Sequence, residues 1–234
     1  MKKFIYLLIL FILSSLFIGS SLPVNEEKTL DEKFVYLTFD DGPNTPVTTE
    51  VLDVLKEKNV KATFFLIGNL VNKEKDLVQR MAKEDHSLGL HSYTHDKNKL
   101  YKNSESFINE MLDTQKAIYE VTGITSNILR FPFGSNNKSF RLTKTMVDSL
   151  HKYNFKIYDW NIDSGDGLNP YLEPYKIAKN CSNAKNGSII LMHCSSVNKN
   201  TAKALPIIID NLKKQGFTFK KIDESTKEVY RVKK

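Results

Sequence analysis

The stretch FVYLTFDDGP, residues 34–43, decides how the rest of the chain is organised. Its first six residues are β-branched, aromatic or apolar and include no breaker, a pattern that predicts a buried strand. Asp40 and Asp41 end this strand, and Gly42-Pro43 forces a turn directly after them. Adjacent aspartates repel each other, so a fold that holds both at one strand end usually supplies a cation. The alternative interpretation is a polar turn after a buried strand.

A regular alternation of strand-like and helix-like segments follows this stretch. Apolar runs predict the strands, and apolar residues at helical spacing between them predict the helices. The expected strands are residues 34–39, 62–67, 87–90, 128–131, 156–160, 188–192 and 217–222. The expected helices are residues 48–58, 76–84, 104–122, 142–153, 174–183 and 204–214. Strands that alternate with helices in this way predict an α/β fold whose seven parallel strands form a closed or nearly closed barrel.

Composition places the chain among ordinary globular proteins. It has 234 residues, of which 41% are hydrophobic, with 10 Gly and 7 Pro, so one α/β domain of barrel size is expected. The formal net charge of +7 comes mostly from Lys and suits an anionic surface such as a bacterial wall. The sequence has neither an Arg cluster nor a repeated aromatic and basic pattern, so no nucleic-acid partner is expected. We expect a monomer.

Residues 1–21 have the features of a secretory leader. Two lysines precede an apolar run of 16 residues, and small residues that suit cleavage follow it. Because this run is marginal in length for a membrane span, a cleaved signal peptide is favoured over a retained N-terminal anchor. Residues 22–33 are interpreted as a linker, 34–224 as the folded domain and 225–234 as a charged C-terminal tail. The protein is therefore expected to be extracellular or cell-wall associated, touching a membrane only through an uncleaved leader.

We expect no catalytic role for five residues that have polar or reactive side chains. The two cysteines, Cys181 and Cys194, are expected to be free thiols, although export would permit a disulfide. His86 and His151 lie outside the motifs described below and are expected to be solvated. Asp163 is expected to cap a turn.

Polar side chains capable of chemistry recur at the carboxyl ends of five predicted strands. An α/β barrel builds its active site at this end of its strands. One such residue would be ordinary, but five strand ends are hard to explain by packing alone. The residues concerned are Asp40, Asp41, His91, His95, Arg130, Asp163, Asp166 and His193.

The segment His91-Ser92-Tyr93-Thr94-His95 places two imidazoles four residues apart. A zinc-protease motif would need Glu at the second position, which is Ser92 here, so that interpretation fails. Two histidines and one carboxylate form a three-ligand site with an open position for water, the usual arrangement for catalytic zinc. Asp41 is the obvious third ligand. The alternative is a pair of surface histidines in a polar loop.

With these motifs together, the chain resembles the polysaccharide deacetylases of carbohydrate esterase family four. The resemblance covers residues 35–222 and includes five motifs in the family's order. They are TFDDGP at 38–43, HSYTH at 91–95, RFPFG at 130–134, DSGD at 163–166 and LMH at 191–193. The chain departs from the family at Phe133, where tyrosine is common, and at Gly167, where tryptophan is frequent.

The resemblance implies a distorted (β/α)-barrel and the metal-dependent removal of N- or O-acetyl groups from sugars. By position, it makes Asp40 the general base and Arg130 the residue that holds it. It implies one divalent metal ion, expected to be zinc, with cobalt or another divalent ion as the alternative. The implied metal ligands are Asp41, His91 and His95.

The same resemblance makes His193 the general acid, paired with Asp166. Histidine suits that role because its pKa lies near working pH and a carboxylate partner raises it. Leu191 is expected to line the acetyl pocket, and the backbone N–H of Phe133 to bind the oxyanion. Because Gly167 leaves one wall of that pocket open, Trp160 is expected to cover it from another direction.

Three functions compete at this point. The leading hypothesis is an exported metal-dependent deacetylase of cell-wall amino sugars, with peptidoglycan N-acetylglucosamine as the expected substrate. The second is a chitin-oligomer deacetylase or an acetylxylan esterase. The third is a wall-binding protein without turnover, which the presence of Asp40 and His193 argues against because binding alone needs neither residue.

Overall fold

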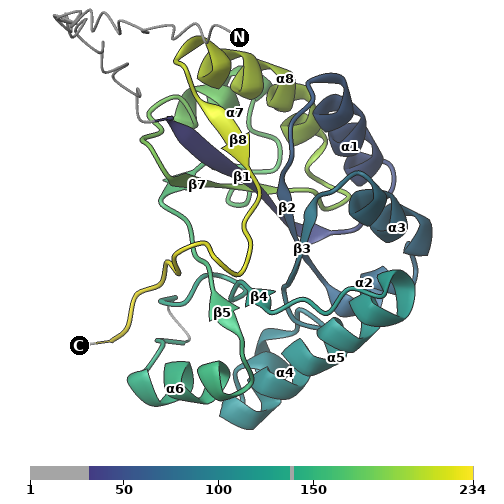
Figure 1. Ribbon diagram of the computed structural model, residues 1–234, viewed down its shortest axis with the longest axis vertical. Helices are drawn as coiled ribbons and strands as arrows, with labels where there is room; N and C mark the ends of the chain where they lie inside the picture. Colours follow the sequence, from purple (N-terminus) through teal and green to yellow (C-terminus); the bar gives the residue numbers. More distant parts are fainter. Residues whose placement is uncertain (1–31, 138–139, 234) are drawn as a thin grey trace, which may run out of the picture. The chain divides into compact units, whose positions relative to one another are not determined.

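The computed structural model describes residues 32–137 and 140–233 (Figure 1). The predicted leader, residues 1–21, and all but the last two residues of the predicted linker lie outside the described residues. Among the described helices, none combines the length and apolar character that a membrane span requires.

The described residues form one parallel sheet of eight strands, so the predicted α/β fold with a barrel-like parallel sheet is confirmed. The strands are β1 (Phe34–Gly42), β2 (Thr63–Leu66), β3 (Ser87–Leu90), β4 (Ile128–Leu129), β5 (Lys156–Ile157), β6 (Ile162–Asp163), β7 (Ser188–His193) and β8 (Thr218–Lys220). Their order is β5-β4-β3-β2-β1-β7-β6, with β8 added to β1. The strand missing from the prediction is β6, whose two residues are too few to produce a pattern.

Strand β1 lies at the centre of this arrangement. Residues 35–40 pair with β7 along one edge. The other edge is shared, because residues 34–36 pair with β8 and residues 38–42 pair with β2. This double use of β1 places Asp40 opposite His193 of β7 and beside Phe65 of β2.

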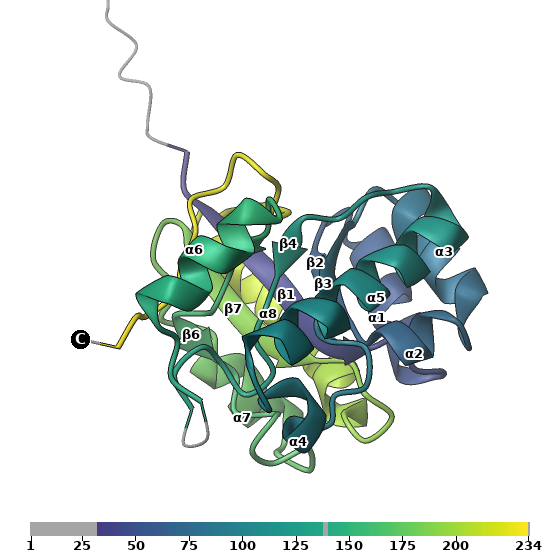
Figure 2. The same ribbon diagram turned by 90° about the horizontal axis from the view of Figure 1, so that it is seen from below.

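Helices cover the outer side of the sheet (Figures 1 and 2). They are α1 (Val47–Glu57), α2 (Gly68–Val71), α3 (Lys75–Lys83), α4 (Lys97–Leu100), α5 (Ser104–Thr122), α6 (Lys144–Lys152), α7 (Pro174–Asn180) and α8 (Lys199–Lys214). The predicted start and stop of the longest helix are confirmed, because the Asn103 side chain caps α5 and Gly123 follows in a left-handed conformation.

Two helix starts differ from the prediction. Helix α1 begins at Val47, one residue before the expected start, and the Thr48 hydroxyl donates to the Cys194 carbonyl at 3.1 Å. Helix α8 begins at Lys199, which puts Pro206 inside the helix rather than in its first turn. The buried apolar face of α8 extends on both sides of Pro206, and this packing offsets the loss of one N–H donor.

Alternation along β1 divides the interior into two cores. Val35, Leu37 and Phe39 face outward and belong to the large core under the helices. Tyr36 faces inward and belongs to a smaller cluster inside the barrel, with Phe34 packed against it. Because Cβ direction alternates, Thr38 and Asp40 follow Phe34 and Tyr36 in one inward-facing column.

His86 is buried, so the expectation that it is solvated is wrong. Its Nδ1 accepts a hydrogen bond from the Ala62 N–H at 3.1 Å, and its ring packs edge-on against Phe64. Burial lowers the pKa of His86 to about 4, so the ring is neutral at physiological pH. His151 is 41% exposed and lies 3.1 Å from Glu228. Periodicity could not separate the two histidines, because the residues that bury His86, Ala62 and Phe64, come beside it only on folding.

The segment after residue 224 is held against β5, although its charge suggests a tail. Val229 forms a bridge with Tyr158, and its N–H donates to the Ile157 carbonyl at 3.1 Å. The Glu228 carboxylate accepts the Ile157 N–H at 2.7 Å. The C-terminal segment therefore supplies hydrogen-bond partners that this side of β5 would otherwise lack (Figure 1).

Glu228→Ala should lower the free energy of unfolding by about 1–3 kcal/mol, because the N–H of the buried Ile157 loses its acceptor. Glu228→Gln is the matched control, since it keeps an acceptor oxygen and should lose much less. Urea unfolding followed by circular dichroism measures both. Equal loss in the two variants would show that the charge, not the acceptor, matters.

Candidate active site

A cavity of about 360 Å³ opens at the carboxyl ends of the strands. It is lined by every predicted site residue except Arg130, which lies fully buried behind Asp40. Those lining residues are Asp40, Asp41, His91, His95, Phe133, Trp160, Asp166, Leu191 and His193. Residues from strands far apart in the chain are thus brought together at the end of the barrel where such sites form.

Asp41, His91 and His95 form a compact cluster. The Oδ1 atom of Asp41 lies 3.4 Å from Nε2 of His91 and 3.3 Å from Nε2 of His95. His91 Nδ1 lies 3.0 Å from the carbonyl of Arg130, an acceptor that requires Nδ1 to carry the proton and leaves Nε2 with a free lone pair. Burial lowers the pKa of His91 to about 3, so this ring is neutral.

The loop that carries His95 is fixed by hydrogen bonds and adopts an unusual backbone. Ser92 and His95 of this loop have positive φ, at 67° and 56°, as does Asp41 of β1, at 66°. Glu110 of α5 accepts the N–H groups of Tyr93 and Thr94 at 2.9 and 2.7 Å. Backbone strain of this kind persists only where surrounding contacts impose it, and it is common at functional sites. Glu110 lies outside the five sequence motifs.

Asp40 is held apart from that cluster by Arg130. The Nη1 of Arg130 donates to Asp40 Oδ1 at 2.9 Å and to Thr38 Oγ1 at 2.7 Å. Burial raises the pKa of Asp40, and the adjacent guanidinium opposes this rise and favours the carboxylate. The second oxygen of Asp40 is 3.8 Å from His91 Nε2, farther than Asp41 Oδ1. Asp41 therefore completes the histidine cluster, and Asp40 lies across from it.

His193 and Asp166 form a buried pair beside Asp40. Nδ1 of His193 lies 2.7 Å from Oδ1 of Asp166, and the His193 N–H donates to Oδ2 at 2.8 Å. Burial alone would lower the pKa of His193, but the hydrogen bond and charge of Asp166 raise it to about 9. Nε2 is left for a reaction partner. The ring is thus protonated at neutral pH and can donate a proton.

Two hydroxyl groups that the sequence analysis missed hold Asp166 in place. Thr201 Oγ1 donates to Oδ2 at 2.6 Å, and Ser164 Oγ donates to Oδ1 at 2.8 Å. Burial by itself would raise the pKa of Asp166, but the hydrogen bonds from His193 and Thr201 lower it overall. Ser164 lies within a recognised motif, but Thr201 belongs to the part of α8 that the helix prediction omitted.

The remaining predicted residues line the wall of the cavity. Leu191 is buried at its base, and Trp160 packs over Gly134. Phe133 is 53% exposed with φ of 65°, and its N–H has no hydrogen-bond acceptor among the described residues. A Cβ on Gly167 would lie 2.4 Å from His193 Cε1. The His193 imidazole therefore packs directly against the backbone of Gly167, the position where the family often has tryptophan.

Asp163 and the cysteines match their expected behaviour. Asp163 accepts the N–H of Gly165 at 2.8 Å and so closes a turn. Cys181 and Cys194 are free and fully buried. Burial raises the pKa of both thiols, which makes them poor nucleophiles.

A parallel barrel that joins a carboxylate–histidine cluster to a separate buried carboxylate and a protonated histidine defines a hydrolase site. The family comparison agrees with this class. The model of the polysaccharide deacetylase family matches residues 27–155, more than half of the chain. The chain therefore belongs to the polysaccharide deacetylases, carbohydrate esterase family four, as its motifs predicted.

Individual relatives support the same assignment. A peptidoglycan-N-acetylglucosamine deacetylase of Bacillus cereus is 38% identical over 84% of this chain and 71% of its own length. PgdA of Listeria monocytogenes, a protein of the same description, is 37% identical over 89% of this chain. The crystal structure of the polysaccharide deacetylase Bc1974 from Bacillus cereus matches with a TM-score of 0.76 and 37% identity, covering 83% of this chain and 94% of that one.

The matched region spans only 42% of the Listeria protein. Activities and partners that depend on the whole of that longer protein are therefore not carried over to this chain.

Thr201→Val should raise the pKa of His193, because the Asp166 carboxylate loses a competing donor and then interacts more strongly with the imidazolium. The alkaline limb of the pH profile of kcat, expected near pH 9 in the wild type, should move up by about 0.5–1 pH unit. Thr201→Ser keeps the hydroxyl and is the matched control. An unmoved limb in Thr201→Val would contradict the role given to this hydroxyl.

The same pair predicts a stability change with pH. The folded pKa of His193, about 9, lies above its unfolded value, so the pair's contribution is complete below about pH 6.5 and lost as pH rises through 9. Thr201→Val raises the folded pKa further and should therefore lose more stability than the wild type between pH 6 and pH 9.5. Thermal unfolding midpoints at the two pH values measure this difference.

Proposed function

We propose that this protein is an exported, metal-dependent deacetylase that removes N-acetyl groups from the N-acetylglucosamine of peptidoglycan. One observation carries the proposal: a carboxylate–histidine cluster, a separately held carboxylate and a protonated histidine line a single cavity. Hydrolysis of an acetamide needs a polarised carbonyl, an activated water and a proton for the leaving amine. The three groups match these three needs.

The residues present fit a divalent cation. Ligand atoms of Asp41, His91 and His95 all lie within 4.8 Å of one another. Asp41 Oδ1 is buried and has no hydrogen-bond partner among the described residues, a costly state that a cation would relieve. One carboxylate and two imidazoles suit zinc, and cobalt or another divalent ion is the alternative. When bound, the ion supplies a Lewis acid that polarises the acetyl carbonyl and makes water more acidic.

Asp40 serves as the general base in this proposal. Its carboxylate accepts the proton of the attacking water, and burial raises its pKa, which strengthens it as a base. Arg130 prevents that carboxylate from turning toward the histidine cluster, because one oxygen is tied to the guanidinium. The two adjacent aspartates therefore have different tasks, determined by their different partners.

His193 serves as the general acid. It lies beside Asp40 across the β1–β7 pairing, so base and acid approach the same carbonyl from neighbouring strands. Its Nε2 carries the proton, since Nδ1 is bound to Asp166, and gives it to the leaving nitrogen of the sugar. The Phe133 N–H donates to the developing oxyanion, and Leu191 and Trp160 enclose the acetyl methyl group.

Substrate identity follows from the relatives and from charge. Both curated relatives named above are described as peptidoglycan-N-acetylglucosamine deacetylases. The formal net charge of +7 suits an anionic wall, and the leader-like residues 1–21 suit delivery to it. N-acetylmuramic acid is disfavoured because its lactyl-peptide would crowd a cavity of about 360 Å³. The protein is accordingly proposed to act outside the membrane.

Single substitutions should separate metal binding from turnover. Asp41→Ala, His91→Ala and His95→Ala should each lose bound metal, measured by elemental analysis after dialysis. Asp40→Asn should keep the metal and lose at least about 10²-fold in kcat, because it removes only the base. If Asp40→Asn loses the metal while Asp41→Ala keeps it, the two roles are exchanged.

A panel of polymers tests the substrate. The metal-loaded protein should release acetate and create new free amines on peptidoglycan, with less of both on chitin oligomers and none on acetylated xylan. Asp40→Asn serves as the control for background hydrolysis. Amines on chitin oligomers alone would establish the chitin alternative, and acetate from xylan without amines would establish the esterase alternative. Binding to the wall without acetate release would favour a non-catalytic binding protein.

A further inference from the structure

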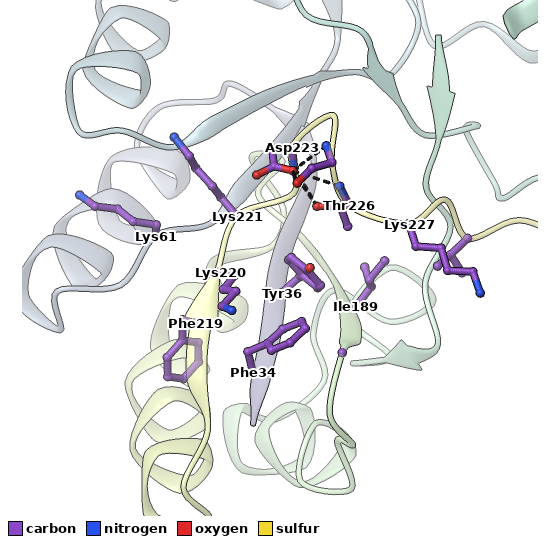
Figure 3. A pocket seen from close by; sticks show the side chains of 13 residues that line it. Phe34, Tyr36, Lys61, Ile189, Phe219, Lys220, Lys221, Asp223, Thr226 and Lys227 are labelled. Carbon is purple, nitrogen blue, oxygen red and sulfur yellow. Dashed lines mark hydrogen bonds between the residues drawn. The ribbon is translucent and has the colours of Figure 1, made fainter. Parts of the chain in front are cut away.

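A second, larger cavity lies at the opposite end of β1 (Figure 3). Its volume is about 770 Å³, and Phe34 and Tyr36, from the start of β1, line it. Asp40, in the catalytic cavity, follows Phe34 by six residues in the same strand, a separation of about 20 Å at the usual rise of a strand. The catalytic residues therefore make no contribution to this cavity, and nothing in the mechanism uses it.

The floor of this cavity is aromatic and apolar. The rings of Phe34 and Tyr36 lie 5.5 Å apart at 81°, and Ile189 of β7 and Val229 complete the surface. Figure 3 draws Phe34, Tyr36 and Ile189 beneath Asp223 and Thr226 of the C-terminal segment. The Tyr36 hydroxyl has no hydrogen-bond partner among the described residues. The cavity thus combines an aromatic floor, in which Tyr36 is only 9% exposed, with one hydroxyl that has no partner among the described residues.

Lysines surround that floor. Lys61, Lys220, Lys221 and Lys227 line the cavity, and no arginine does. The one acidic lining residue, Asp223, is engaged by the hydroxyls of Ser225 and Thr226. Asp223 offsets one of the four lysine charges, so the lining keeps a net positive charge.

Two of these lysines are available for a ligand. Lys61 donates to the Glu84 carbonyl, and Lys221 pairs with Asp85. Lys220 Nζ instead lies 4.3 Å from the centre of the Phe34 ring and only loosely pairs with Glu32, at 3.6 Å. Lys227 is exposed and has no ion-pair partner among the described residues.

We propose that this cavity binds a phosphate-bearing saccharide. Lysine is a compact point charge suited to phosphate, whereas planar carboxylates are more often held by arginine, which is absent here. The aromatic side chains of Phe34 and Tyr36 match the apolar face of a pyranose, and the Tyr36 hydroxyl meets a sugar hydroxyl. Lys220, positioned above the Phe34 ring, binds the phosphate next to the sugar, and Lys227, which lies across the cavity in Figure 3, adds positive charge to the lining.

This site goes beyond the proposed catalytic function and does not depend on it. A glycan bound at one end of the barrel leaves the catalytic cavity free at the other. An anionic polymer held there would raise the local concentration of the wall near the enzyme without changing its chemistry.

Titration of the isotope-labelled protein with glucose 1-phosphate, followed by amide NMR shifts, tests the proposal. Shifts should concentrate at residues 34–36, 189 and 220–229, and binding should weaken as NaCl is added. Lys220→Gln with Lys227→Gln should weaken binding by about tenfold or more, since one charged contact and a second positive charge of the lining are lost. Lys176→Gln with Lys203→Gln removes the same charge from exposed helix positions and should change binding less than about twofold.

Each of the following results would overturn the proposal. Shifts confined to the catalytic cavity, or no binding, would show that the lysine-lined cavity is not a ligand site. Equal weakening by the two double variants would reduce it to general charge attraction. Inorganic phosphate binding as tightly as glucose 1-phosphate, or glucose doing so, would remove either the saccharide or the phosphate from the assignment. Acetate release is not the readout, so failure here and failure of the deacetylase function are distinguished.

Discussion

The buried guanidinium of Arg130 is the constraint on which the rest of the structure depends. It lies inside the barrel, fully buried, over the ring of Phe65, and it donates to Thr38, Asp40 and the carbonyl of Tyr158. Removing one partner of such a buried pair costs about 3–5 kcal/mol, because the other charge is left without compensation. Arg130 therefore links β1, β4 and β5 through electrostatics, and this link determines which way the carboxylate of Asp40 faces.

From this centre the barrel interior divides into two ends. Toward the carboxyl ends of the strands, Asp40 opens into the catalytic cavity. Toward the other end, Tyr36 and Phe34 face the lysine-lined cavity. The alternation of β1 produces both, because every second residue points inward. One strand thus supplies the proposed general base and part of the proposed recognition surface, at opposite ends.

Electrostatic roles at the catalytic end are assigned by partners rather than by residue type. Asp40, Asp41 and Asp166 are all aspartates, yet one faces a guanidinium, one faces two imidazoles and one is surrounded by donors. The histidines differ in the same way. Burial keeps His91 neutral, while Asp166 keeps His193 protonated, so one can offer a lone pair and the other a proton. A proton acceptor and a proton donor therefore lie in a single cavity.

The sequence alone determined the α/β class, the parallel strands and the set of strand-end residues, because apolar runs, turn residues and motif spacing are local properties. It could not reveal Thr201 or Glu110, which reach the site from helices far along the chain. Nor could it show that His86 is buried or that Glu228 and Val229 bond to Ile157 of β5, since both depend on segments that meet only after folding. Which aspartate faces which partner was decided by tertiary structure, because a partner's distance and burial, not its spacing in sequence, set the charge that a carboxylate carries.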